Sequence, residues 1–337
     1  MKTKQMLILP AVLAWAIPCS AQLFKGEGLY PIMESGKWGL VNADGKVVLK
    51  PENAAAERSS EGLARVKKDG KWGYVDASGN WTIKPQYDRA YDFHDGMARV
   101  FDAKLIGSEY GYINEEGKLV IEYKFQDAGE FVDGLAPVKN EGKWGYVDKH
   151  GNMAIDAQFD DAAGFSEGLA RVKMGGKLGG KYGYIDPSGK MVINAKFDET
   201  GDFSDGLAPI KVDGKWGFID EDGTVVIEPQ FAEASNFSDG LARVRVGGLI
   251  GGKYGYVGKN GSMVIKPRYS DAEAFHNGYA AVEVNGKWGY VDKSGEVVID
   301  AQFNEVDDFD GEVACVHAGD EMYWINKQGQ RVHIHAG

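Results

Sequence analysis

Short runs of alternating hydrophobic and polar residues, separated by glycine-containing turns, dominate the sequence from residue 28 onward. Residues 63–66 have the composition of a strand, Asp69-Gly70 is typical of a tight hairpin turn, and residues 72–76 return as a second strand. A turn at residues 77–80 leads to a third predicted strand at residues 81–83. We expect Pro85 to end that strand, because proline has no N–H to donate to a β-ladder. The pattern predicts a three-stranded β-meander and no long amphipathic helix.

The meander recurs along the chain around a tetrad resembling Lys-Trp-Gly-Tyr. A ninth, degenerate copy lies at residues 322–325, with Trp324 aligned to the glycine. The glycine spacing alternates between 34 and 38 residues, so a pair of copies 72 residues long is a candidate structural period. A phenylalanine in each connection is predicted to fill the join between neighbouring copies. The tetrad glycines are Gly39, Gly73, Gly111, Gly145, Gly183, Gly217, Gly255 and Gly289, and the phenylalanines are Phe93, Phe131, Phe165, Phe203, Phe237, Phe275 and Phe309.

These repeats predict an all-β fold of tandem three-stranded meanders spanning one array, residues 22–337. Both ends of the array fall in the same phase of the repeat, and no copy is split between the termini. We therefore expect an open solenoid-like or superhelical array, with a closed, propeller-like ring as the alternative. In an open array the degenerate ninth copy would protect the exposed sheet edge at its end.

The N-terminus has the features of a secretory signal peptide over residues 1–21. Lys2 and Lys4 precede an apolar run at residues 6–18, and Cys19-Ser20-Ala21 supplies small residues before a cleavage site at Gln22. The apolar run is too short to span a bilayer, and no transmembrane segment is expected in the mature chain. The alternative to cleavage before Gln22 is a lipoprotein anchored through Cys19. Either way, we expect an exported protein: periplasmic, on the cell surface or secreted.

Composition and charge narrow the possible partners. The chain has 38 basic and 50 acidic residues, for a formal net charge of −12, and no basic patch is evident along the sequence. This balance repels phosphate backbones, so we expect no nucleic-acid partner. Removal of residues 1–21 would leave Cys315 as the single cysteine, so an intramolecular disulfide is excluded in the mature chain.

The tetrads, the downstream Asp-x-x-Gly turns, the Val-Ile-x-Pro strands and the Phe-x-Asp-Gly-Leu-Ala connections together resemble the WG-repeat family of bacterial proteins. The resemblance covers about residues 28–334. It departs from the family pattern at Ser59, where the connecting phenylalanine would stand, and in the ninth copy. The family has no general catalytic residues to carry over, so the resemblance implies an architecture and leaves the function open.

The aromatic residue of each tetrad is our candidate for ligand binding. Regularly spaced rings provide flat apolar platforms for sugars or cell-wall polymers, whereas the simpler alternative is that each ring packs in the core of its own repeat. Period-2 alternation places Trp72 and Tyr74 on one face of the strand but does not reveal which face is exposed. The eight candidates are Trp38, Trp72, Tyr110, Trp144, Tyr182, Trp216, Tyr254 and Trp288.

No catalytic residue, metal site or cofactor is predicted. His317, His333 and His335 are the best metal-ligand candidates, but no zinc-binding motif accompanies them, and a solvated tail explains the last two. The two glycine-rich stretches at residues 175–181 and 247–253 lack the Ser or Thr of a phosphate-binding loop and are predicted to be long hairpin turns. Cys315 lies in a β-rich run and is predicted to be a small core residue.

We therefore predict an exported, non-catalytic protein that presents a binding or scaffolding surface to protein partners in the cell envelope, through its variable hairpin tips and connections. The alternative is a carbohydrate or cell-wall binding module that uses the repeated aromatic residues. An enzyme of unknown type is a weaker alternative, because a single catalytic centre fits poorly with nearly identical repeats.

Overall fold

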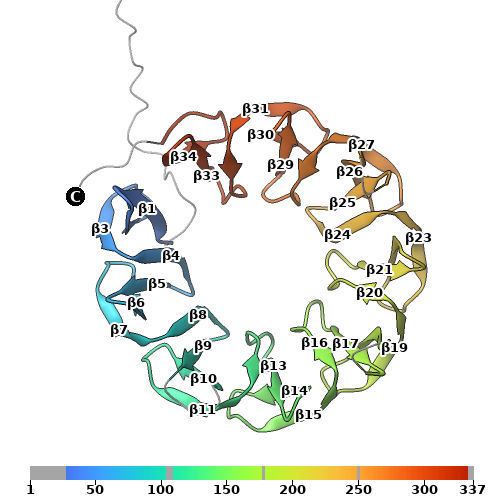
Figure 1. Ribbon diagram of the computed structural model, residues 1–337, viewed down its shortest axis with the longest axis horizontal. Coiled ribbons are helices and arrows are strands. Elements are labelled where there is room, and N and C mark those ends of the chain that lie inside the picture. The colour runs from blue at the N-terminus through green and yellow to red at the C-terminus, as the bar shows by residue number, and fades with distance from the viewer. Residues whose placement is uncertain (1–27, 104–108, 177–178, 249–250, 333–337) are drawn as a thin grey trace, which may run out of the picture.

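The protein is a ring of nine small β-sheets, the blades of a β-propeller, around a central opening (Figure 1). The computed structural model describes residues 28–103, 109–176, 179–248 and 251–332. Within these residues every regular element is a strand. The all-β prediction is confirmed.

The first four blades contain fifteen strands. Blade 1 comprises β1 (Tyr30–Glu34), β2 (Lys37–Val41) and β3 (Val47–Asn53). Blade 2 comprises β4 (Ala55–Ser60), β5 (Leu63–Lys68), β6 (Lys71–Val75) and β7 (Trp81–Tyr87). Blade 3 comprises β8 (Arg89–His94), β9 (Met97–Asp102), β10 (Glu109–Asn114) and β11 (Leu119–Phe125). Blade 4 comprises β12 (Asp127–Ala128), β13 (Leu135–Asn140), β14 (Lys143–Asp148) and β15 (Met153–Phe159).

The remaining five blades continue the same order. Blade 5 comprises β16 (Asp161–Ala162), β17 (Ala170–Met174), β18 (Lys181–Ile185) and β19 (Met191–Phe197). Blade 6 comprises β20 (Glu199–Thr200), β21 (Ala208–Val212), β22 (Lys215–Ile219) and β23 (Val225–Phe231). Blade 7 comprises β24 (Glu233–Ser238), β25 (Leu241–Val246), β26 (Lys253–Gly258) and β27 (Met263–Tyr269). Blade 8 comprises β28 (Asp271–Ala272), β29 (Tyr279–Val284), β30 (Lys287–Asp292) and β31 (Val297–Phe303), and blade 9 comprises β32 (Glu305–Val306), β33 (Val313–Ala318) and β34 (Glu321–Asn326).

Neighbouring strands within a blade are antiparallel and follow chain order. The predicted meander at residues 63–83 corresponds to β5, β6 and β7, and the Asp69-Gly70 turn has positive φ at both residues, as a tight hairpin requires. The sequence missed the strand that precedes the meander in blades 2–9. In blades 4, 5, 6, 8 and 9 this strand is two residues long, too short to produce a periodic pattern.

The outermost strand does not end at Pro85, contrary to the sequence prediction. It continues to Tyr87, with a bulge between the residues that pair with Trp72 and Tyr74. Proline is tolerated here because β7 is an edge strand at the outer rim, where an N–H need not pair (Figure 1).

The bulge explains the glycine of each tetrad. A Cβ atom added to Gly73 would lie 2.5 Å from the carbonyl oxygen of Ile83 and 2.7 Å from the backbone nitrogen of Pro85. The same backbone approach recurs at Gly39, Gly145, Gly183, Gly217, Gly255 and Gly289. Glycine is therefore required because the outermost strand crosses directly over it.

From blade 2 to blade 9, a buried aromatic pair joins each blade to the next. Tyr146 has no exposed surface, its hydroxyl donates a 2.7 Å hydrogen bond to the carbonyl of Ala163 in the following blade, and its ring lies 5.1 Å from that of Phe165. Equivalent hydroxyl bonds join Tyr74, Tyr112, Tyr184, Tyr256 and Tyr290 to the next blade. The prediction that the connecting phenylalanines fill the joins is confirmed: each is buried and packs on such a ring.

The ring closes by packing the first blade against the last. Trp324 donates an indole hydrogen bond of 3.0 Å to the carbonyl of Pro31, and its ring meets Tyr30 edge-on at 5.5 Å. Arg58 of blade 2 lies over the ring of Tyr30 and forms a salt bridge with Asp310 of blade 9, so blade 2 also contributes to the seam. One cluster of buried residues, including Tyr30, Val313 and Trp324, is shared by both blades.

The closed ring, the alternative in the sequence-based prediction, is thus the observed arrangement, and the open array expected first is not. The ends meet because their core residues complete a join, without exchange of a strand among the described residues. Strand register also corrects the alignment of the ninth copy. Tyr323 pairs with Val316 as Gly73 pairs with Val66, so Tyr323 stands at the glycine position. Trp324 stands at the position of the buried tyrosine and closes the ring instead of capping an open end.

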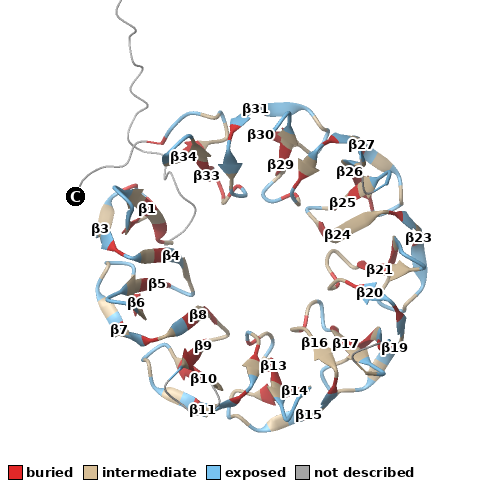
Figure 2. Ribbon diagram, in the orientation of Figure 1, coloured by how far each residue is buried: buried red, intermediate tan, exposed pale blue. Residues whose placement is uncertain are grey.

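The distribution of buried residues follows the arrangement of the blades. Buried residues lie within the blades and between them, whereas the outer strands, such as β23 and β31, carry many exposed residues (Figure 2). Cys315 is 3% exposed, as expected of a core residue, and burial raises the pKa of its thiol to about 12.

Candidate functional site

The eight predicted ligand-binding rings all occupy the second residue of equivalent strands. Each is half-buried, neither fully exposed nor enclosed in the core. Most pack one side against the hydrophobic cluster of their own junction, as Trp72 does beside Tyr87 and Phe93. The eight residues are Trp38 (β2), Trp72 (β6), Tyr110 (β10), Trp144 (β14), Tyr182 (β18), Trp216 (β22), Tyr254 (β26) and Trp288 (β30).

Basic side chains approach several of these rings. The ammonium groups of Lys173 and Lys211 lie 5.2 Å and 5.6 Å from the ring centres of Tyr182 and Trp216. Arg65 and Lys67 both approach Trp72, at 5.5 Å and 5.7 Å. Cation–π contacts of this kind stabilise a ring by about 0.5–1 kcal/mol at exposed sites and occupy part of its face. The platform hypothesis stays a prediction, and on this geometry a ligand would have to compete with the protein's own cations.

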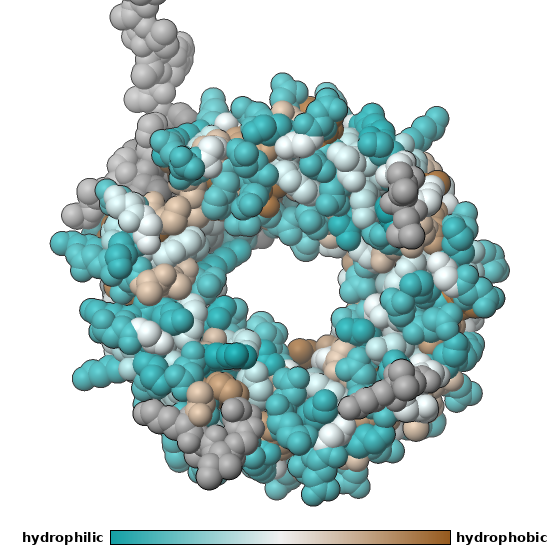
Figure 3. All heavy atoms as spheres, in the orientation of Figure 1, coloured by the Kyte–Doolittle hydropathy of each residue, from teal (hydrophilic) through white to brown (hydrophobic). Residues whose placement is uncertain are grey.

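The wall of the central opening is formed by the first strand of blades 2–9 and the residues that follow it. In Figure 1, β8 and β24 run inward to loops at the rim of the opening, whereas β7, β19 and β23 lie at the outer circumference. With all atoms drawn, the opening stays clear and most of the surface facing the viewer is hydrophilic (Figure 3). The wall segments are residues 55–60, 89–94, 127–132, 161–166, 199–204, 233–238, 271–276 and 305–310.

These wall segments carry the acidic excess of the protein. Their basic residues are two arginines, Arg58 and Arg89, against fourteen carboxylates. The whole chain has a net charge of −12, so by residue count the excess lies in these segments, but basic side chains compensate part of it. Six of the carboxylates, Asp92, Glu199, Asp202, Glu233, Glu273 and Asp310, are paired with an arginine or a lysine. The carboxylates are Glu57, Asp92, Asp127, Glu130, Asp161, Glu199, Asp202, Glu233, Asp271, Glu273, Glu305, Asp307, Asp308 and Asp310.

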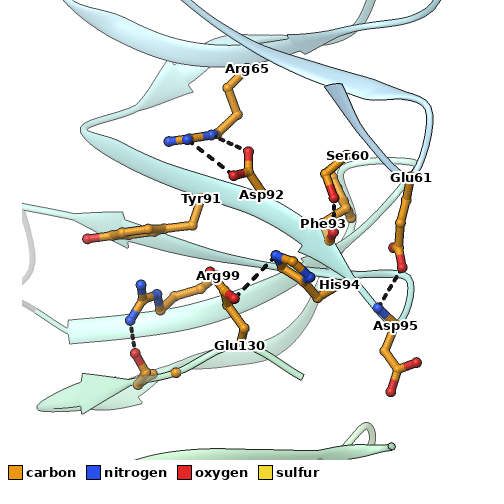
Figure 4. A network of polar contacts seen from close by, with 12 residues as sticks. Ser60, Glu61, Arg65, Tyr91, Asp92, Phe93, His94, Asp95, Arg99 and Glu130 are labelled. Carbon is orange, nitrogen blue, oxygen red and sulfur yellow. Dashed lines mark hydrogen bonds and ion pairs between the residues drawn. The ribbon is translucent and has the colours of Figure 1, made fainter. Parts of the chain in front are cut away.

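Part of this negative charge is used to join blades 2, 3 and 4 (Figure 4). Arg65 of β5 reaches Asp92 on β8 at 2.6 Å, and His94 lies 3.2 Å from Glu130 of the following blade. The carboxylate of Glu61 accepts hydrogen bonds from the backbone N–H groups of Asp95 and Gly96, at 2.8 and 2.9 Å. The turns that border the opening are therefore tied to one another around the ring.

Blades 8 and 9 carry acids that repel one another. The pKa of Glu273 is raised, first by desolvation and also by the charges of Asp271 and Asp308. The pKa values of Asp307 and Asp308 are also raised, first by burial and then by the charges of Glu305 and Asp307 respectively. His317 opposes the shift of Asp307, and His276, 3.3 Å from Asp308, opposes that of Asp308. Sequence reasoning counted these acids but had no means of placing them together on one wall.

Other chemistry is weakly represented. Among the described residues, no group of three or more His, Cys, Asp or Glu side chains is arranged to hold a metal ion. His333 and His335 lie outside those residues, as do Cys19 and the predicted signal peptide. No helix long and apolar enough to cross a membrane occurs in the described part of the chain.

A family model described as WG containing repeat matches the chain eight times, at residues 38–72, 72–101, 110–144, 144–177, 182–216, 216–249, 254–288 and 288–317. These matches cover most of the chain and coincide with the first eight tetrads. Among curated proteins, none matches the sequence.

Similar solved structures are distant in sequence. Hsv2p of Kluyveromyces lactis matches with 9% identity and a TM-score of 0.43, over 82% of this chain and 96% of that one. The extracellular domain of a putative hybrid two-component system from B. thetaiotaomicron matches with 11% identity and a TM-score of 0.37, over 92% of this chain and 53% of that one. The tricorn protease matches with 12% identity and a TM-score of 0.28, and this chain spans 40% of its length. Likenesses at this level carry no argument about function.

Proposed function

The chain belongs to the WG containing repeat family, and on that premise we propose that it is an exported, non-catalytic scaffold that binds protein partners in the cell envelope. Binding takes place at the wall of the central opening, and the partner presents a basic segment. No nucleic acid is expected there, because its phosphates would be repelled.

This proposal rests on one observation: the repeated residues hold the fold together, whereas the residues on the wall of the opening vary from blade to blade. The repeated tyrosine, phenylalanine and glycine are used within the fold, in the joins between blades and under the outermost strand. The wall segments differ from blade to blade, from Ala-Ala-Glu-Arg-Ser-Ser at residues 55–60 to Glu-Val-Asp-Asp-Phe-Asp at residues 305–310. A surface whose side chains vary over a fixed frame suits recognition of a partner.

Charge indicates the chemistry of that partner. Acids held on a concave wall reinforce one another and raise the local concentration of cations, which speeds the encounter with a basic segment. The pKa values of Glu273, Asp307 and Asp308 are raised first by burial and also by neighbouring carboxylates, and a bound cationic segment would relieve this second contribution.

The test is binding of a fluorescently labelled, extended peptide of alternating lysine and serine to the full chain. The wall variant combines E273Q, D307N and D308N, and the matched control combines D220N, E221Q and D222N in the β22–β23 turn. Both remove three carboxylates, but at 0.15 M salt charges farther apart than about 8 Å are largely screened. We expect the wall variant to weaken binding at least tenfold and the control less than twofold. Equal weakening in both variants, or no binding by the native chain, would overturn the proposal.

A further inference from the structure

A second site, separate from the wall of the central opening, lies on the outer part of blade 2. An open surface depression of about 370 Å³ is bordered by the tip of the β5–β6 hairpin and by the outermost strand, β7. Its lining residues are Lys68, Asp69, Lys71, Trp81, Lys84 and Pro85, which we call the lysine–tryptophan pocket. Its volume falls in the range of small-ligand sites, about 300–1,000 Å³.

The other blades show that the fold does not require these residues. Strand register places Val47, Leu119, Met153, Met191, Val225, Met263 and Val297 at the position of Trp81. At the position of Lys68, register places Glu34, Asp102, Asn140, Met174, Val212, Val246, Val284 and Ala318. Blade 2 is thus the described blade that combines a tryptophan with lysines at all three cationic positions of the pocket.

The pocket is lined mainly by cationic side chains, although the protein as a whole is acidic. Three lysines face one lining carboxylate, Asp69, in a protein whose net charge is −12. Lys71 is paired with Asp88, whereas Lys68 and Lys84 are both exposed. These two ammonium groups are therefore placed to pair with an anion, through charge-assisted hydrogen bonds that are stronger than neutral ones.

The apolar part of the pocket adds a shape requirement. Trp81 is half-buried: one part of the indole packs against the cluster that contains Leu40 and Val75, and another part borders the depression beside Pro85. An indole combined with a proline ring offers flat apolar contact area at low entropic cost. A ligand that suits both features has an anionic group and a rigid ring with an apolar face.

We propose that the lysine–tryptophan pocket binds an acidic oligosaccharide. The carboxylate of a uronate unit pairs with Lys68 and Lys84, its pyranose ring lies against Trp81, and Asp69 accepts hydrogen bonds from ring hydroxyls. This site differs from the eight tetrad aromatics. The proposal does not depend on the proposed binding of protein partners at the central opening.

The test titrates the full chain with an α-1,4-linked trimer of galacturonic acid, followed by calorimetry. Maltotriose serves as the neutral sugar and a tri-glutamate peptide as the acidic peptide. We expect binding of the acidic trimer, at least tenfold weaker binding of maltotriose and of the peptide, and loss of affinity as salt rises.

Variants separate the pocket from the rest of the surface. W81V introduces the valine found at the same position in blade 1, and K84Q removes one cation. K266Q removes the equivalent lysine of blade 7, where Met263 replaces the tryptophan, and it is the matched control. We expect W81V and K84Q each to weaken binding at least tenfold and K266Q to leave it unchanged, with far-UV circular dichroism unchanged in all three.

Several results would overturn the inference. Native affinity in W81V and K84Q would place any binding elsewhere, and equal affinity for the tri-glutamate peptide would reduce the pocket to an unspecific anion site. Absence of binding by the native chain would also reject it, while leaving the peptide experiment on the channel wall unaffected.

Discussion

Replacing Tyr146 with phenylalanine isolates one hydroxyl of the bond network between blades. The Tyr146 hydroxyl donates a 2.7 Å hydrogen bond to the carbonyl of Ala163, and its side chain has no exposed surface. Phenylalanine fits this position, because Phe218 occupies it in blade 6 with its ring 4.9 Å from that of Phe237. The Tyr146→Phe variant therefore retains the aromatic packing and loses only the bond.

The cost follows from the buried environment of the bond. A typical hydrogen bond contributes about 0.5–1.5 kcal/mol net, and a buried acceptor left unpaired costs about 1–3 kcal/mol. We expect Tyr146→Phe to lower the free energy of unfolding by about 1–2 kcal/mol. Tyr146→Ala also leaves a cavity, for which about 3–5 kcal/mol is expected, as for other large aromatic truncations.

Equilibrium unfolding in urea, followed by both circular dichroism and tryptophan fluorescence, measures these changes, and coincidence of the two transitions checks that a two-state free energy applies. Phe218→Tyr is the reciprocal control, since it adds a hydroxyl where the repeat already uses phenylalanine. A Tyr146→Phe variant within 0.5 kcal/mol of the native protein would refute the view that these hydroxyls stabilise the ring.

Three further predictions concern the tetrad glycine Gly73, the ion pair of Asp160 with Lys143, and the seam between blades 1 and 9. Gly73→Ala should cost about 1–3 kcal/mol in urea unfolding, because its Cβ would lie 2.5 Å from a backbone oxygen, whereas Gly248→Ala, with no atom within 4 Å, should stay within about 0.5 kcal/mol of native. The pKa of Asp160 is held below its ordinary value of 3.8, first by the hydrogen bond from Lys143 and then by the N–H of Gly176, so its stabilisation is present above about pH 4 and is lost as the pH falls further. Asp160→Asn should therefore flatten the fall of the melting temperature between pH 5 and pH 3, and an unchanged acid slope would count against this contact. Trp324→Phe removes the hydrogen bond to Pro31, which should cost about 1 kcal/mol and speed amide exchange in β1 and β34 but not in β17 and β18; uniform acceleration would show that the seam is not a separate weak point.

Local chemistry was predictable from the sequence because it repeats. The Asp69-Gly70 hairpin, the strands around residues 63–83 and the buried phenylalanines such as Phe93 follow from turn preferences and alternation, and repetition made each inference stronger. The first strand of blades 4, 5, 6, 8 and 9 was missed because its pairing with the next strand is brief, as at Asp161 and Ala162. The prediction that Pro85 ends its strand was wrong because proline is excluded from central strands but tolerated in an edge strand such as β7.

Global geometry was not predictable in the same way. Whether an array closes depends on the angle between successive blades, which is set by packing such as Tyr146 on Phe165 and has no pattern in the sequence. The candidate site was missed for a related reason. Counting residues gives the net charge, but only the order of strands around the opening places Asp92, Glu273 and Asp308 on one wall.

The central claim is that nine blades close into a ring through the contact of blade 1 with blade 9. Small-angle X-ray scattering of the purified chain at low concentration tests it most directly. The account predicts the compact pair-distance distribution of a flat ring, whose largest dimension stays unchanged when Trp324→Phe weakens the seam without separating it. A distribution with a long tail, as an extended or superhelical array gives, would contradict closure and with it the existence of a channel wall.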